Sequence, residues 1–118
     1  MCDKSIEGFF LASRVKTVFN TETKSVEEYF NDIEYEIIKL NGNSQYLVKQ
    51  TNLNSGSIAQ LIFFKSNHAV GYLSSSDNGI DNIFYNELGE LVHNWSIPID
   101  SNGNLTNAHA ILYRINKH

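Results

Sequence analysis

The first third of the chain carries apolar residues at helical spacing. Leu11, Val15, Val18 and Phe19 fall at i, i+4, i+7 and i+8, which is one face of a 3.6-residue turn. This spacing predicts a helix over residues 9–19. Phenylalanine, valine and threonine also favour sheets, so a strand over the same residues is the competing interpretation.

A second, shorter helix is predicted directly afterwards. Ser25 and Glu28 have the spacing of a capping box, in which the two side chains satisfy the free backbone N–H groups of a helix start. The apolar stripe that follows supports the helix and consists of Val26, Tyr29, Phe30 and Ile33.

The hydrophobic period changes to two near residue 34, which is typical of strands. Two apolar runs, 33–40 and 46–53, flank Asn41-Gly42-Asn43, and the Asn-Gly pair favours a tight hairpin turn. Residues 58–65 fit a strand and a helix equally well. Further strands are predicted where turn signals recur, over residues 68–76, 80–86, 90–97 and 105–115.

Together these patterns predict an α+β fold in a single domain, residues 1–118. One or two N-terminal helices would pack on a strongly curved antiparallel meander. The small side chains Ala108 and Ala110 on one face of the last strand would make room for a crossing helix. If residues 9–19 are a strand instead, the alternative is a small closed β-barrel of the calycin-like kind.

Composition narrows the classes of function. The 118 residues are 42% hydrophobic and 19% charged, which suits one globular core. The net charge is −4 and no basic run occurs, so we expect no nucleic-acid binding and no attachment to an anionic membrane. No stretch reaches the roughly 20 apolar residues of a membrane span, and no signal peptide is visible, so we expect a cytoplasmic protein.

The candidate chemical motifs are weak. Asp100, Asn102 and Asn104 alternate as in a calcium loop, but glycine falls at the wrong position and no acidic residue closes the loop, so a hairpin turn is predicted. His93 and His109 lie on neighbouring predicted strands, yet no cysteine or glutamate joins them at ligand spacing. We therefore predict no metal site and no cofactor.

One segment resembles a known family. Residues 81–100 read DNIFYNELGELVHNWSIPID and resemble the closing strand pair of SnoaL-like proteins, with Phe84, Gly89, Leu91 and Trp95 in matching places. The resemblance implies the α+β cone of the nuclear-transport-factor-like superfamily. At the positions where that family has its acid–base His and Asp, this chain has Asn94 and Ser96, so the resemblance implies the fold without the chemistry.

Three functional hypotheses follow. The first is binding of a small, largely apolar molecule in a pocket between helix and sheet, without catalysis or with weak catalysis; a homodimer that shares the pocket is compatible with such a sheet. The second is an acidic interaction or inhibitor protein of the immunity type, which a surface cluster of Glu27, Glu28, Asp32, Glu34 and Glu36 would favour. The third is an enzyme with a histidine base and a tyrosine donor, although no catalytic residue is assigned. The expected pocket wall is Trp95, His93, Tyr72, Tyr85, His109 and Tyr113.

Overall fold

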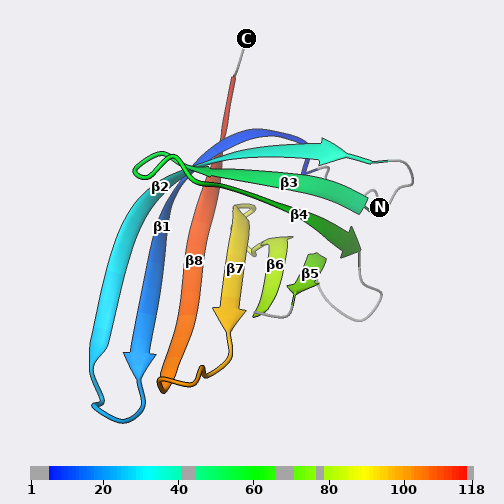
Figure 1. Cartoon of the computed structure of the whole chain (residues 1–118). Helices are drawn as coiled ribbons and strands as arrows, with labels where there is room; N and C mark the ends of the chain where they lie inside the picture. The colour runs from blue at the N-terminus through cyan, green and yellow to red at the C-terminus, as the bar shows by residue number, and fades with distance from the viewer. Residues whose placement is uncertain (1–5, 41–44, 66–70, 77–78, 117–118) are drawn as a thin grey trace.

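The computed structural model shows an all-β chain (Figure 1) and describes residues 6–40, 45–65, 71–76 and 79–116. Within these ranges there is no helix. In the described part of the chain, accordingly, no helix is long and apolar enough to cross a membrane. The strands are β1 (Gly8–Asn20), β2 (Val26–Lys39), β3 (Gln45–Asn52), β4 (Ile58–Lys65), β5 (Tyr72–Ser76), β6 (Gly79–Tyr85), β7 (Leu91–Ile97) and β8 (Asn104–Ile115).

The strands form a closed barrel in simple up-and-down order. Each strand pairs antiparallel with the next, and β8 pairs with β1 to close the barrel. Closure gives every described strand a hydrogen-bonded neighbour on both sides, which protects a sheet from pairing with another chain. The long strands β1, β2 and β8 continue past the ends of β6 and β7 at the bottom of Figure 1, so one side of the barrel is taller than the other.

The hydrophobic core fills the barrel interior. Alternate residues of each strand point inward, and an eight-stranded barrel is just wide enough to be filled by side chains or to hold one small ligand. Ile6, which precedes β1, is buried with this core. The buried cluster comprises Ile6, Phe10, Ala12, Ile33, Tyr35, Ile37, Tyr46, Val48, Phe63, Tyr72, Ile83, Leu91, Ala110 and Leu112.

The predicted first helix is wrong, because its residues form β1. A spacing of four is even, so Leu11, Val15 and Phe19 share one face of a strand as readily as one face of a helix. The inward face begins with the buried Phe10 and continues to Arg14, a charged residue. The polar residue on the inner face hid the alternation that would have identified the strand.

The predicted second helix is also wrong. Ser25 belongs to the turn between β1 and β2, where its carbonyl accepts a hydrogen bond from the Asn20 N–H at 2.9 Å. The Asn20 side-chain oxygen accepts from the N–H groups of Glu22 and Thr23, so an asparagine closes the turn. Glu28 therefore lies on a strand and caps no helix.

The α+β fold and the SnoaL-like cone are both contradicted, and the alternative of a small closed barrel is confirmed. The segment behind the resemblance does form a hairpin, β6–β7, but such hairpins occur in any antiparallel sheet. The ambiguous residues 58–65 are strand β4. The turn at Asn41-Gly42-Asn43 lies outside the described residues, as do Asp77 and Asn78.

The predicted turn at Asp100 is confirmed. Its carboxylate Oδ1 accepts hydrogen bonds from the N–H groups of Asn102 and Asn104 at 2.9 and 3.0 Å. These bonds shape the connection between β7 and β8. The oxygen pattern that resembled a calcium loop therefore serves the hairpin itself.

Candidate functional site

A chain of three buried polar side chains crosses the barrel interior. The Tyr35 hydroxyl on β2 lies 2.6 Å from Nδ1 of His93 on β7. Nε2 of the same ring lies 2.7 Å from a carboxylate oxygen of Asp81 on β6. His93 and Asp81 are each about 4% exposed and Tyr35 is fully buried. Buried polar groups are stable only when paired, and each member of this chain satisfies its neighbour.

Tyr35 and Asp81 define which atoms donate and which accept in the two hydrogen bonds of His93. Burial raises the pKa of Tyr35, so its hydroxyl keeps its proton and donates to Nδ1 of His93. With Nδ1 accepting this bond, Nε2 carries a ring proton and donates it to the carboxylate of Asp81. The ring of Phe63 packs nearly edge-on against His93, with centroids 5.9 Å apart, and helps to hold the imidazole in this orientation.

This arrangement leaves His93 without a free ring nitrogen. Both nitrogens are bonded to protein groups, so the imidazole cannot take a proton from a bound molecule unless one of these bonds breaks first. His109, the other candidate base, is exposed on the outer face, where its Nδ1 lies 2.6 Å from the side-chain oxygen of Asn94. The geometry thus leaves His93 no free ring nitrogen to act as a base, whereas the bond to Asn94 occupies only Nδ1 of His109.

A cavity of about 140 Å³ lies beside this chain, inside the barrel. Its buried floor includes His93 and Asp81, and its rim reaches solvent at the exposed Ala59. On β8, Ala110 pairs with His93 and Ala108 pairs with Trp95, so two small side chains face two large ones. The alanines that were expected to accommodate a helix instead leave the space empty. The lining residues are Arg14, Gln50, Ala59, Leu61, Asp81, His93, Trp95, Ala108, His109 and Ala110.

Arg14 is the only arginine or lysine among the residues that line this cavity. It projects from the inner face of β1, where its strand neighbours are Asn31 on β2 and Ala110 on β8. Its Nε is buried and has no hydrogen-bond partner among the described residues. The guanidinium is close enough to Tyr35 for its positive charge to oppose, in part, the rise in that tyrosine's pKa that burial causes. A cation with an unsatisfied donor therefore faces the cavity.

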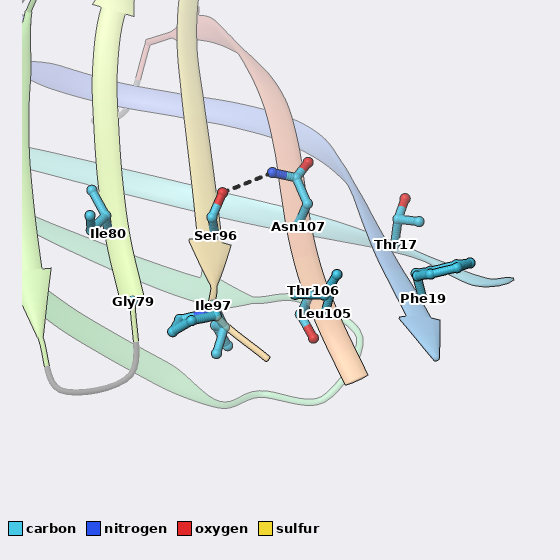
Figure 2. A pocket seen from close by; sticks show the side chains of 10 residues that line it. Thr17, Phe19, Gly79, Ile80, Ser96, Ile97, Leu105, Thr106 and Asn107 are labelled. Atoms are coloured by element: carbon cyan, nitrogen blue, oxygen red, sulfur yellow. Dashed lines mark hydrogen bonds between the residues drawn. The ribbon is translucent and has the colours of Figure 1, made fainter. Parts of the chain in front are cut away.

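A larger hollow of about 580 Å³ lies on the outside of the barrel (Figure 2). Figure 2 shows Thr17, Ile80, Ser96 and Asn107 on the face of β1, β6, β7 and β8 that is turned away from the other strands. Ser96 and Asn107 hydrogen-bond to each other there at 3.0 Å. None of the lining side chains is titratable, so this hollow has apolar surface but no charged group to orient a ligand.

Three of the six expected wall residues line the inner cavity, namely His93, Trp95 and His109. Tyr72 is buried in the core, edge-on to Tyr46 with ring centroids 5.0 Å apart. Tyr85 and Tyr113 line a different hollow of about 270 Å³, and Tyr113 is 61% exposed. His109 lines the edge of the inner cavity although strand alternation turns its side chain outward.

Sequence reasoning missed Arg14, Gln50 and Asp81 as cavity residues. Strand alternation would have found Arg14, because Phe10, Ala12 and Arg14 share one face once residues 9–19 are taken as a strand. Asp81 pairs with Trp95 across β6 and β7, a register that the hairpin turn could have suggested. The same alternation would have found Gln50, which shares one face of β3 with the buried Tyr46 and Val48.

No group of three or more metal-ligating side chains occurs in the part of the chain that the structure describes. His68 and His118 lie outside that part. The nearest approach to a ligand set is His93 with Asp81, and both are already bonded to each other.

The fold and the cavity define the class of this protein as an eight-stranded up-and-down β-barrel with a small internal cavity open at one end. Comparisons with protein-family models, curated proteins and solved structures found no match to the chain. A fold hosts many functions, so the barrel alone does not identify the function.

Proposed function

We propose that this protein binds one small molecule inside the barrel, in the cavity beside Trp95. The carrying observation is the inner cavity itself, which joins an apolar wall to one unsatisfied cation, Arg14. Barrels of eight strands are of the size that holds a single small ligand. The pocket expected between a helix and a sheet does not exist in the described chain, because no helix does.

Binding without catalysis is the form of this function that the geometry supports. The imidazole of His93 is engaged at both nitrogens, and the hydroxyl of Tyr35 is engaged with it. These groups form a rigid polar floor for the cavity.

The test is fluorescence of Trp95 during titration with a panel of small aromatic and aliphatic molecules. As the only tryptophan, Trp95 reports on one place, the cavity wall. We expect a saturable shift or quench that is retained in Tyr113→Ala, because Tyr113 lines a different hollow. Emission that no member of the panel changes, or a change that is equally lost in Tyr113→Ala, would contradict binding at this site.

A second candidate function rests on the outer face of β2. Strand alternation places Glu28, Asp32, Glu34 and Glu36 on that face, opposite the inward Ile33, Tyr35 and Ile37. Four of the five acidic residues named from sequence therefore share one surface. Glu27 lies on the other face, where its carboxylate accepts a hydrogen bond from Tyr29. An acidic strip of this kind would complement a basic protein partner.

Different amino-acid substitutions test the two candidate functions. If a basic partner docks on β2, the double variant Glu28→Lys/Asp32→Lys will abolish a salt-sensitive complex, and Ala110→Leu will leave that complex intact. Pull-down followed by binding measurements with the purified partner at about 50 and 300 mM salt is the assay, since surface electrostatics weaken with ionic strength. A complex that survives the charge reversal would exclude this surface.

A further inference from the structure

We propose that the ligand of the inner cavity is a small organic carboxylate about the size of one aromatic ring, with its carboxylate held by Arg14. This inference rests on the proposed function and names its ligand class. It follows from three features of the cavity: an unsatisfied cation, a limited volume and an uneven distribution of charge.

The first feature is the donor on Arg14. A buried donor without a partner is destabilising, and more so when the group is charged. Asp81 lines the same cavity, but its ion-pair partner in the described chain is His93, at 2.7 Å. A guanidinium presents a planar fork of N–H groups that fits a carboxylate with two parallel hydrogen bonds. The carboxylate of a bound ligand would therefore supply the hydrogen-bond acceptor that Nε of Arg14 lacks in the described chain.

The second feature is the volume. The cavity measures about 140 Å³, and a cavity of roughly 150 Å³ is known to hold a molecule as small as benzene. The apolar wall is formed by Leu61, Ala108, Ala110 and the indole of Trp95. A single ring, or a branched chain of similar size, would fill this space. Fatty acids, steroids and tetrapyrroles are too large for it.

The third feature is the placement of charge. Asp81 is buried at the floor, so an anionic group is disfavoured there and favoured at the Arg14 side. Lys16 follows Arg14 on the inner face of β1 and lies 5.3 Å from the centre of the Tyr29 ring. Lys16 does not line the cavity, so Arg14 alone supplies positive charge to its wall, although the whole chain carries a net charge of −4. The ligand would enter ring first, with its acid group last.

The experiment compares benzoate with benzamide, which has nearly the same shape without the charge, by calorimetry on the whole chain. We expect benzoate to bind the unmodified protein at least tenfold more tightly than benzamide. Arg14→Gln should weaken benzoate at least tenfold and change benzamide by less than about twofold. Lys16→Gln is the matched control, because it removes the same charge from the same strand face, and it should weaken benzoate by less than about threefold.

The outcomes separate this inference from the proposed function. If benzamide binds as tightly as benzoate and Arg14→Gln changes neither, the carboxylate assignment is wrong while binding in the cavity stands. If neither compound binds, and the Trp95 titration with the wider panel is also silent, both fail. Circular dichroism of each variant verifies the barrel, and Arg14→Lys, which keeps the charge without the fork, should retain part of the benzoate affinity if Arg14→Gln proves poorly folded.

Discussion

Tyr35 and His93 hydrogen-bond across the barrel, from β2 to β7, although 58 residues separate them in the chain and their strands are not neighbours in the sheet. The 2.6 Å contact joins opposite walls through the interior. Because Asp81 continues the chain on β6, three strands share one polar network beneath the cavity. The network fixes the floor on which a ligand would rest.

Tyr35→Phe should destabilise the protein by about 1–3 kcal/mol, because it leaves the buried Nδ1 of His93 without a partner. Urea unfolding followed by circular dichroism measures this change. Tyr113→Phe is the control, since Tyr113 is 61% exposed and its hydroxyl can bond to water. Equal effects of the two substitutions would show that the hydrogen bond to His93 contributes nothing particular to stability.

Alkaline pH should weaken the fold through Tyr35. Burial raises the pKa of this tyrosine above its ordinary value of 10.0. Above pH 10 the unfolded chain loses the Tyr35 proton while the folded chain keeps it, so the stability contribution is complete below pH 10 and declines as pH rises further. The expected slope is about −1.4 kcal/mol per pH unit from this one group.

The measurement is the free energy of unfolding between about pH 9 and pH 11.5 for the unmodified protein and Tyr35→Phe, a range that spans the ordinary tyrosine pKa. The other tyrosines contribute to both curves, so the difference between the two slopes isolates Tyr35. Parallel curves across this range would contradict the protonated, buried phenol.

Ala110→Leu should fill the inner cavity and lower the affinity of any ligand bound there at least tenfold. The added carbons enter the space between His93 and Arg14, since Ala110 pairs with both across β8. Overpacking typically costs about 1–3 kcal/mol, so the barrel should remain folded only if its stability exceeds that amount. Ala110→Val adds less volume and is a smaller perturbation of the same cavity.

Leu105→Ser is the matched variant for the outer hollow. Leu105 lines that hollow and is 41% exposed, so its replacement should leave inner-cavity binding unchanged. Trp95 fluorescence titrations of both variants decide between the two locations. Binding that survives Ala110→Leu and disappears in Leu105→Ser would place the ligand on the outside of the barrel.

Two glycines with positive φ should differ sharply when replaced by alanine. Gly56 has φ of +80°, and a Cβ added there would meet nothing within 4 Å. Gly56→Ala should therefore cost only the strain of the left-handed conformation, about 1 kcal/mol. Gly71 has φ of +84°, and a Cβ there would lie 2.3 Å from the carbonyl oxygen of Ile83. Gly71→Ala should cost clearly more, as thermal unfolding of the two variants would show; equal melting temperatures would contradict the close packing at Gly71.

The later strands could be predicted from the sequence because two signals agree in them. Around β6 and β7 a period of two coincides with Glu87-Leu88-Gly89 at the turn. Asp100 likewise specified its own turn through side-chain bonds to nearby N–H groups. Such local interactions involve residues close in the chain, and the sequence displays them directly.

The first two strands could not be predicted, because their faces are not simply apolar and polar. The inward face of β1 carries the apolar Phe10 and, further along, the charged Arg14. The first five residues of β2 are exposed on both faces of the strand. The apolar residues that remain have even spacings, which a helix and a strand satisfy together. Pairing with β2 over Gly8–Phe19 and with β8 over Phe9–Asn20 decides the conformation of β1.

By itself the sequence determined an acidic composition, the later strands and turns, and the presence of His93 and Trp95 on one strand face. Tertiary structure alone decided that the sheet closes into a barrel and that Tyr35, His93 and Asp81 meet inside it. It also decided that Arg14 faces a cavity beside two alanines. The physical reason is that closure depends on hydrogen bonds between β1 and β8, which lie at opposite ends of the chain, and no local pattern records contacts between residues so far apart.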